Sequence, residues 1–247
     1  MAALSRRSVL AGTVVAGFGV GGVPPASAQQ RRSPDRAVSL TRLEQEEPRR
    51  LTALVTKQRP VEPLRYLPPD LVTWKRSRHQ VRAEVAEHLD AMFSAALRSD
   101  LRLRVVSGFR SYDTQADTHR YWAAHYGQAA ADVTSARAGH SEHQTGLAVD
   151  LDVRGDAGRC YLDACFGATP EGRWTAAHAY RYGFLQSYPR GYRDRTGYVY
   201  EPWHLRYVGP RVAAEMRRRG VVLLADYLRQ AHRVADPALP VAASRPR

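Results

Sequence analysis

The stretch SEHQTGLAVDLDV (residues 141–153) passes from an irregular segment into a β-strand. Residues 147–153 have the aliphatic composition of a strand, and side chains alternate between the two faces of a strand. One face therefore carries Ala148, Asp150 and Asp152, and the other carries Val149, Leu151 and Val153. We expect the aliphatic face to pack on the core. The two carboxylates then share the opposite face, either as a solvated edge or as part of a site.

The segments around this strand show both helical and strand signals. Apolar residues at 81, 85, 89, 92, 93 and 96 fall on one face of a helix within residues 79–100. Further helices are predicted over 113–127, with Asp113 as N-cap, over 173–184, stopping at Gly183, and over 210–219 and 221–232. Strands are predicted within 101–109 and 200–209, and the proline-rich segment 59–74 is predicted as extended chain anchored by Tyr66, Leu67, Leu71 and Trp74. Helices mixed with a few separated strands indicate an α+β domain.

The N-terminus has the features of an export signal. Arg6 and Arg7 precede an apolar run over residues 9–23, and residues 26–28 supply small side chains before a cleavage site. The run is too short and too glycine-rich for a good membrane span, so residues 1–28 are predicted to be a signal peptide. The sequence SRRSVL resembles a twin-arginine signal, with an ordinary Sec signal as the alternative. We therefore expect an exported protein of the periplasm, cell wall or extracellular space, without a stable membrane span after processing.

The 219 residues that follow are enough for one domain with a substantial core. We divide them into a flexible lead-in over 29–50, a folded domain over 51–233 and a disordered tail over 234–247. Loss of residues 1–28 removes two arginines and no acid, so the net charge falls from +13 to +11. This charge either suits anionic cell-wall polymers as partners or reflects a general excess of arginine. No nucleic-acid partner is expected, because no groove-entering or stacking motif accompanies the charge.

Two cysteines, Cys160 and Cys165, lie in the sequence CYLDAC. Outside the cytoplasm a nearby pair usually forms a disulfide. A zinc-binding pair is the alternative, but a single pair at this spacing is a weak zinc signal. We predict a disulfide that closes a small loop.

A metal site is one interpretation of the acidic strand. His143 lies seven residues before Asp150, and a turn at Thr145-Gly146 can return its imidazole to the strand. A catalytic zinc commonly has three protein ligands and one open position. Six histidines lie in predicted helical stretches and are expected to be surface or packing residues: His79, His88, His119, His125, His178 and His232. His140 and His204 remain as further ligand candidates, and Asp152 remains an alternative to Asp150.

Two more residues have the chemistry to act beside a metal. Glu201 precedes His204 by three residues, and an acid close to a metal ligand can serve as general base to a metal-activated water. Arg110 lies in the turn after a predicted strand, where a fixed guanidinium can bind a carboxylate or stabilise a developing oxyanion. Taken alone, each of these residues also fits a purely structural role.

Three separate stretches together resemble the VanY-like D-alanyl-D-alanine carboxypeptidases, which belong to the zinc peptidase group that includes VanX and hedgehog-like domains. The motif S-x-H-x-x-G-x-A-x-D is matched by residues 141–150, the motif E-x-x-H by Glu201 and His204, and the motif S-G-[YF]-R-S-x-x-x-Q by residues 107–115. The resemblance spans roughly residues 50–210, and the order and spacing of three motifs argue strongly against a chance match.

The resemblance implies a small antiparallel sheet that carries the zinc site and is flanked by helices, with residues 51–233 as the catalytic domain. It implies one Zn²⁺ ion bound by His143, Asp150 and His204, rather than by His140 or Asp152. The implied catalytic residues are Glu201 and Arg110. The expected substrate contacts are Arg110, Ser141, Gln115 and Trp203.

The implied activity is removal of the terminal D-alanine from peptidoglycan stem peptides that end in D-Ala-D-Ala. Two alternatives remain open at this point. One is a peptidoglycan endopeptidase of the same group. The other is a non-catalytic, zinc-stabilised module that binds the cell wall, although an intact Glu201 argues against it because a purely structural site needs no base.

Overall fold

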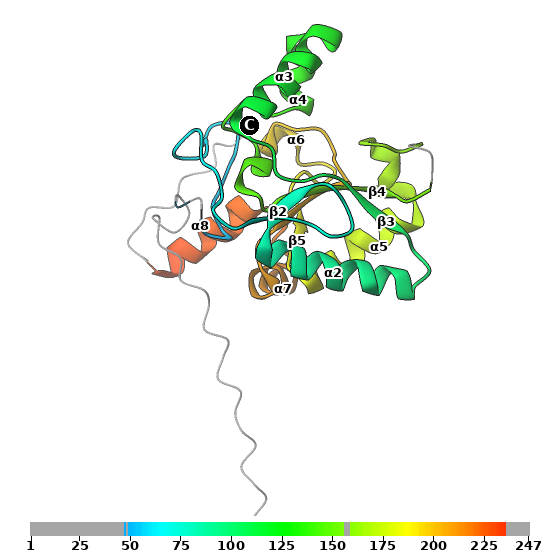
Figure 1. The fold of residues 1–247 in the computed structure, drawn as a ribbon. Coiled ribbons are helices and arrows are strands. Elements are labelled where there is room, and N and C mark those ends of the chain that lie inside the picture. Colours follow the sequence, from blue (N-terminus) through cyan, green and yellow to red (C-terminus); the bar gives the residue numbers. More distant parts are fainter. Residues whose placement is uncertain (1–46, 48, 156–158, 236–247) are drawn as a thin grey trace, which may run out of the picture. The chain divides into compact units, whose positions relative to one another are not determined.

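The computed structural model describes residues 47, 49–155 and 159–235 (Figure 1). The predicted signal peptide, nearly all of the predicted lead-in and residues 236–247 lie outside this part of the chain. Within the described residues, no helix is long and apolar enough to cross a membrane.

Within the same residues the strands form two antiparallel sheets. A hairpin joins β1 and β2, and four strands form the central sheet in the order β3-β4-β6-β5. The strands are β1 (Leu71–Thr73), β2 (Gln80–Arg82), β3 (Leu103–Ser107), β4 (Ala148–Val153), β5 (Phe184–Gln186) and β6 (His204–Tyr207). The predicted α+β class with a small antiparallel sheet is confirmed.

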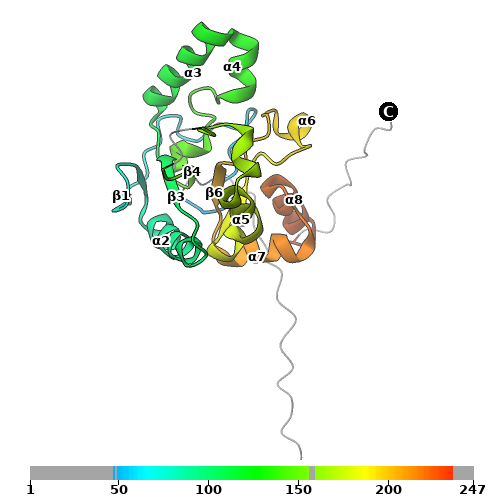
Figure 2. The same ribbon diagram turned by 90° about the vertical axis from the view of Figure 1, so that its right-hand side faces the viewer.

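Helices lie on both sides of the central sheet. They are α2 (Ala83–Arg98), α3 (Tyr112–Tyr126), α4 (Gln128–Thr134), α5 (Pro170–His178), α6 (Arg193–Thr196), α7 (Pro210–Arg219) and α8 (Leu224–Ala235), with short 3-10 helices η1 (Glu142–Thr145), η2 (Ala164–Ala168) and η3 (Ala179–Tyr182). Figures 1 and 2 place α2, α5 and α7 on one side of the sheet and the hairpin of α3 and α4 on the other. The two sides of the sheet therefore have different neighbours.

The aliphatic face of β4 packs on the core as predicted. Val149 and Leu151 have no exposed surface and lie in one apolar cluster with Leu89 of α2 and Leu205 of β6. Burial of a leucine or valine side chain contributes about 1.5–3 kcal/mol. A one-residue slip of β4 would instead turn Asp150 towards this cluster, so core packing fixes the register that carries the acids.

The opposite face of β4 is not a solvated edge. Asp150 is 5% exposed and Asp152 is 1% exposed, so both carboxylates are removed from water. Buried carboxylates require charged or hydrogen-bonding partners, and these partners define the site described below.

Most predicted elements appear within a few residues of their expected bounds. The predicted helix over 173–184 is instead α5 followed by η3, and its last residue, Phe184, begins β5. Other differences concern α3, the extended segment and α8. Ser111, not Asp113, is the N-cap of α3: its Oγ accepts a hydrogen bond from the Thr114 amide at 3.2 Å, while the Asp113 carboxylate pairs with Arg65.

The predicted extended segment ends in the hairpin β1–β2. Leu67 is 63% exposed, so it is not an anchor, whereas Tyr66 and Trp74 are buried. Finally, α8 continues to Ala235, two residues into the predicted tail.

The predicted disulfide joins Cys160 to Cys165. It closes the loop that leads from β4 towards η2. Leu162 lies inside this loop with a positive φ of 47°, a backbone conformation that is rare for a branched residue. The disulfide therefore constrains a turn whose leucine reaches the cavity described next.

Candidate active site and metal centre

Antiparallel pairing of β4 with β6 brings the first two candidate ligands together. Asp150 and His204 are direct partners in the register of these strands, so their side chains leave the sheet on the same face. His204 Nδ1 lies 3.0 Å from Asp150 Oδ1. Residues 54 positions apart in the sequence thus become neighbours through backbone pairing alone.

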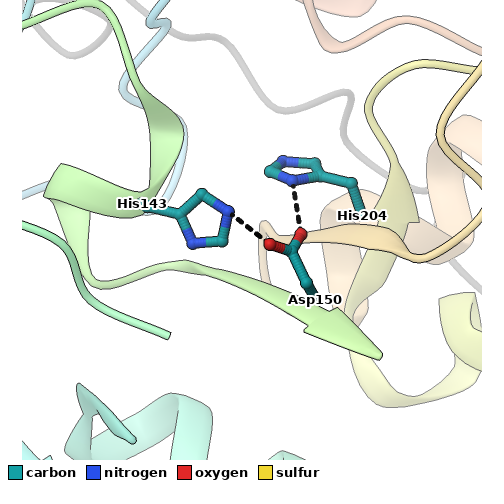
Figure 3. A group of neighbouring side chains, drawn as sticks. All are labelled: His143, Asp150 and His204. Carbon is teal, nitrogen blue, oxygen red and sulfur yellow. Dashed lines mark hydrogen bonds and ion pairs between the residues drawn. The ribbon is translucent and has the colours of Figure 1, made fainter. Parts of the chain in front are cut away.

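The third candidate ligand comes from the turn before β4. His143 lies in η1, which ends at Gly146 in the left-handed conformation with φ of 68°. A Cβ at Gly146 would also lie 2.9 Å from Arg82 Cγ, so both backbone and space favour glycine. This turn returns the His143 ring to the strand, where its Nε2 lies 3.1 Å from Asp150 Oδ2 (Figure 3).

The three side chains fit a single zinc ion. One ligand atom from each of His143, Asp150 and His204 lies within 4.8 Å of the other two, and all three residues are buried. His143 Nδ1 lies 2.7 Å from the Gly108 carbonyl oxygen, whereas its buried Nε2 faces the Asp150 carboxylate. Donation from Nδ1 to this carbonyl leaves the Nε2 lone pair directed at the site. Two imidazole nitrogens and one carboxylate oxygen form a common donor set for catalytic zinc.

The other candidate ligands are elsewhere. The Asp152 carboxylate forms an ion pair with Arg104 of β3. His140 Nδ1 lies 2.9 Å from the Thr56 carbonyl oxygen. Neither side chain belongs to the three-residue group, in agreement with the ligand set that the resemblance implies.

A buried glutamate that sequence reasoning missed holds the second histidine. Glu142 is 5% exposed, and its Oε2 accepts hydrogen bonds from His204 Nε2 at 2.9 Å and from Ser187 Oγ at 2.6 Å. With Nε2 donating to Glu142, the His204 Nδ1 lone pair faces Asp150. A carboxylate behind a metal-binding imidazole fixes its tautomer and ring orientation and raises its basicity. The only sequence signal was an acid directly before His143.

Arg206 compensates the charge of Glu142. Its side chain has no exposed surface, and one guanidinium nitrogen lies 3.3 Å from Glu142 Oε1. Another nitrogen donates to the carbonyl oxygens of Leu51 and Ala53, at 3.1 and 2.8 Å. Burial would raise the pKa of Glu142, but the His204 hydrogen bond and the Arg206 charge outweigh it and hold the pKa at about 2. The carbonyl groups of residues 51 and 53 thereby help to fix Arg206, and through it Glu142, behind the metal site.

Burial, more than the nearby charges, keeps His143 in the neutral form that binds a metal. Burial, followed by the nearby Arg110 guanidinium, lowers the pKa of His143 to about 4. The Arg110 amide donates to the His143 carbonyl at 3.2 Å, and its side-chain Nε is buried without a hydrogen-bond partner. Arg110 therefore stands at the site with an unused donor.

Glu201 lies beside the ligand group in a water-poor position. Glu201 is 7% exposed, and burial raises the pKa of its carboxyl group to about 8. The backbone amide of His204 donates to the Glu201 carbonyl at 3.2 Å, so a tight turn links the acid to the ligand strand. A cation bound nearby would favour the carboxylate form of this acid.

A cavity of about 130 Å³ opens onto these residues. Four residues proposed from the sequence line it together with the three ligand candidates: Arg110, Ser141, Glu201 and Trp203. Its wall also includes aromatic and aliphatic side chains that the sequence did not single out: Trp122, Leu162, Tyr188 and Tyr198. Their positions arise from α3, the disulfide loop and the segment before β6, which approach one another only in the folded chain.

Gln115 does not reach the cavity, contrary to the expectation that it contacts substrate. Its side chain has no exposed surface, and its Nε2 donates to the Ala136 carbonyl at 2.6 Å and to Ser135 Oγ at 3.3 Å. Ser135 and Ala136 form part of the cavity wall. Gln115 thus lies on the inward face of α3 and supports the wall from behind.

Comparison with known proteins places this site in a family. The family model for VanY, D-alanyl-D-alanine carboxypeptidase, matches residues 78–210. The Bacillus subtilis (strain 168) protein YodJ, which is named as a carboxypeptidase, is 39% identical over 184 residues. This match covers 71% of the chain and 66% of YodJ.

Two solved structures have the same fold. The LdcB LD-carboxypeptidase is 38% identical with a TM-score of 0.67, covering 74% of this chain and 87% of that structure. A VanY D,D-pentapeptidase from a VanB-type resistance cassette, determined in complex with Zn(II), is 29% identical with a TM-score of 0.62, covering 72% of this chain and 98% of that structure. The cavity, the zinc-binding donor set and these similarities lead to one conclusion: the chain belongs to the VanY D-alanyl-D-alanine carboxypeptidase family of zinc metallopeptidases.

Proposed function

We propose that this protein is a zinc-dependent D,D-carboxypeptidase that removes the terminal D-alanine from peptidoglycan stem peptides. The observation that carries the proposal is the convergence of His143, Asp150 and His204 on one point, with Glu201 in the same cavity. Family membership supports a peptide substrate, and the D-alanyl-D-alanine activity in the family's name supports the choice of bond.

In this proposal, Glu201 and Arg110 have different roles in hydrolysis beside the zinc ion. When bound, zinc supplies a Lewis acid and lowers the pKa of a water molecule towards ~7. Glu201 accepts a proton from the attacking water and delivers it to the nitrogen of the departing D-alanine. Arg110 offsets negative charge that grows on the scissile carbonyl oxygen, which suits its buried, unpartnered Nε.

The surrounding wall controls what reaches these groups. Ser141 and Trp203 line the cavity next to the ligands, and we assign them to substrate contact. Tyr188 covers the His204 ring, with ring centroids 4.8 Å apart. A wall with so many ring and methyl groups excludes bulk water, which strengthens the electrostatic effects of Glu201 and Arg110.

A second candidate activity is an L,D-carboxypeptidase, which acts on the bond between an L-residue and a terminal D-residue. The similarity to the LdcB LD-carboxypeptidase favours it. The two activities differ in the residue on the amino side of the scissile bond. A stem pentapeptide ending in D-Ala-D-Ala and the tetrapeptide that lacks the last alanine therefore separate them.

We also propose that the protein acts outside the cytoplasm, on a wall that carries anionic polymers. The predicted signal peptide, the disulfide and a net charge of +11 after processing support this location. We propose no nucleic-acid partner, because no groove-entering or stacking motif accompanies the positive charge.

The test pairs metal analysis with assays on both peptides, each with and without chelator. Chelator-sensitive loss of one alanine from the pentapeptide supports the D,D-carboxypeptidase, and loss from the tetrapeptide alone supports the L,D-activity. Cleavage inside the peptide would identify an endopeptidase. Wall fragments that bind zinc-loaded protein but are never hydrolysed would identify a binding module.

Replacement of Glu201 by glutamine separates zinc binding from catalysis. Glu201→Gln is expected to retain zinc and to lower kcat by about 10²–10⁴-fold, because a general base contributes this much. His204→Ala is expected to lose both zinc and turnover. Glu87→Gln, on the exposed face of α2, is the matched control and should change neither quantity. A near-normal rate in Glu201→Gln would remove Glu201 from its proposed role.

Replacement of Glu142 by glutamine tests the support behind His204. Glu142→Gln should weaken zinc binding by about 10–100-fold, since it removes the negative charge that orients His204 and raises its basicity. The measurement is the zinc Kd from competition with a chromophoric chelator, with thermal unfolding of the zinc-free protein as a check on folding. An unchanged Kd in a folded variant would show that Glu142 does not act through His204.

The raised pKa of Glu201 predicts a pH-dependent stability in zinc-free protein. The folded-state pKa of about 8 lies above the usual 4.5, so stability from the protonated acid is complete below pH 4.5 and is lost as pH rises towards 8. Glutamine does not titrate. Between pH 5 and pH 7.5, Glu201→Gln should therefore gain about 3 kcal/mol relative to wild type. Urea unfolding in the presence of chelator measures the free energy of unfolding of both proteins. A difference between them that does not change with pH would contradict the assignment of Glu201 as a buried, protonated acid.

A further inference from the structure

A second cavity adjoins the active site and is lined by charged side chains. Its volume is about 300 Å³, and its wall consists of Lys57, Asp132, Ser135, Arg137, His140 and Tyr198. Ser135 and Tyr198 also line the active-site cavity. These two residues therefore form a wall that the two cavities share.

The lysine in this cavity has a positive charge without a carboxylate partner. Lys57 Nζ donates to the backbone carbonyl of Asp132 and lies 4.5 Å from the centroid of the Tyr198 ring. Within the described part of the chain it forms no ion pair. A carbonyl dipole and a ring face compensate an ammonium group only in part.

The acid in the same cavity is already neutralised. Both carboxylate oxygens of Asp132 accept hydrogen bonds from Arg137, each at 3.0 Å, and Gln128 donates to one of them at 3.1 Å. Asp132 is therefore occupied by a bidentate pair rather than available to Lys57. With this pair formed, the cavity has one net positive charge from Lys57.

Two further observations favour an anionic ligand. The Tyr198 hydroxyl is buried and has no hydrogen-bond partner, so the shared wall contains an unused donor. Burial, opposed in part by Asp132 and reinforced by Arg137 and Arg193, lowers the pKa of Lys57. An anionic group bound beside Lys57 would offset the cost that burial imposes on its ammonium.

We infer that this second cavity is a subsite for a carboxylate of the stem peptide, located on the amino side of the scissile bond, with Lys57 as its counter-charge. The inference rests on the proposed function and extends it to substrate selection. Stem peptides carry free carboxylates upstream of their terminal alanines. In this assignment, a peptide with its last residue at the zinc site runs along the shared wall of Ser135 and Tyr198 and places an upstream carboxylate at Lys57.

The test compares two stem pentapeptides that differ only in charge. One has free carboxylates upstream of D-Ala-D-Ala, and the other has these groups amidated. For the full-length, zinc-loaded protein we expect kcat/KM to be about tenfold higher for the carboxylate peptide, the effect of one charge-assisted hydrogen bond. Lys57→Gln should bring this ratio close to one.

Matched variants separate the subsite from general effects of charge. Lys75→Gln removes the chain's other lysine, which is 72% exposed and pairs with Asp90, and it should keep the wild-type ratio. Arg137→Gln leaves Asp132 without its bidentate partner, so it should also lower the ratio. Because Arg137 is exposed, this variant provides a test even if Lys57→Gln does not fold. Equal kcat/KM for both peptides in the wild type, or a ratio that Lys57→Gln and Arg137→Gln leave unchanged, would overturn the inference.

Calorimetric binding of both peptides to zinc-free protein distinguishes failure of the subsite from failure of the proposed function. Tighter binding of the carboxylate peptide that depends on Lys57 supports the subsite even if neither peptide is hydrolysed. Hydrolysis of both peptides with equal binding overturns the subsite and leaves the proposed function intact. Failure of the protein to bind either peptide overturns the inference directly.

Discussion

The register between β4 and β6 is the constraint on which the site depends. This pairing sets Asp150 opposite His204, while Val149 and Leu151 on the other face of β4 are buried in the core. The same alternation that buries the aliphatic side chains therefore directs the acid to the metal-binding face. Core packing and ligand placement are thus two results of one strand register, and a change that shifts this register would destroy both.

Three buried charges, Asp150 of this pair and two charges beside it, would destabilise the fold if they stood alone. Glu142, Arg206 and Asp150 are each nearly or fully buried, and a buried unpaired charge is costly. Each has partners. Asp150 lies between His143 and His204, and Glu142 lies between His204 and Arg206. Arg206 also donates to the carbonyls of Leu51 and Ala53. The network joins the segment before β1, the turn of η1 and strand β6, and this cross-linking keeps the His204 ring in one orientation.

The sequence predicted features that depend on residues close together in the chain, such as the two faces of a strand and the residues of short motifs. Strand alternation assigned Val149 and Leu151 to the core, and short motifs in the family pattern identified His143, Asp150, His204 and Glu201. Contacts between residues far apart in the sequence could not be predicted. Glu142 is hydrogen-bonded to His204, 62 positions away, and the second cavity is lined by residue 57 together with residues within 132–140 and residue 198. At the start of α3, Ser111 and Asp113 are both good N-cap residue types, so residue type alone did not decide between them, and the structure shows Ser111 as the cap.

X-ray absorption spectroscopy of the zinc-loaded protein tests the central claim most directly, because it reports the atoms around the ion without requiring activity. The account predicts a zinc ion with two imidazole nitrogens and oxygen donors at ~2.0–2.2 Å, and no sulfur, since the cysteines form a disulfide. A sulfur neighbour at ~2.3 Å, or a spectrum that His143→Ala leaves unchanged, would show that the ion is bound elsewhere and would contradict the account.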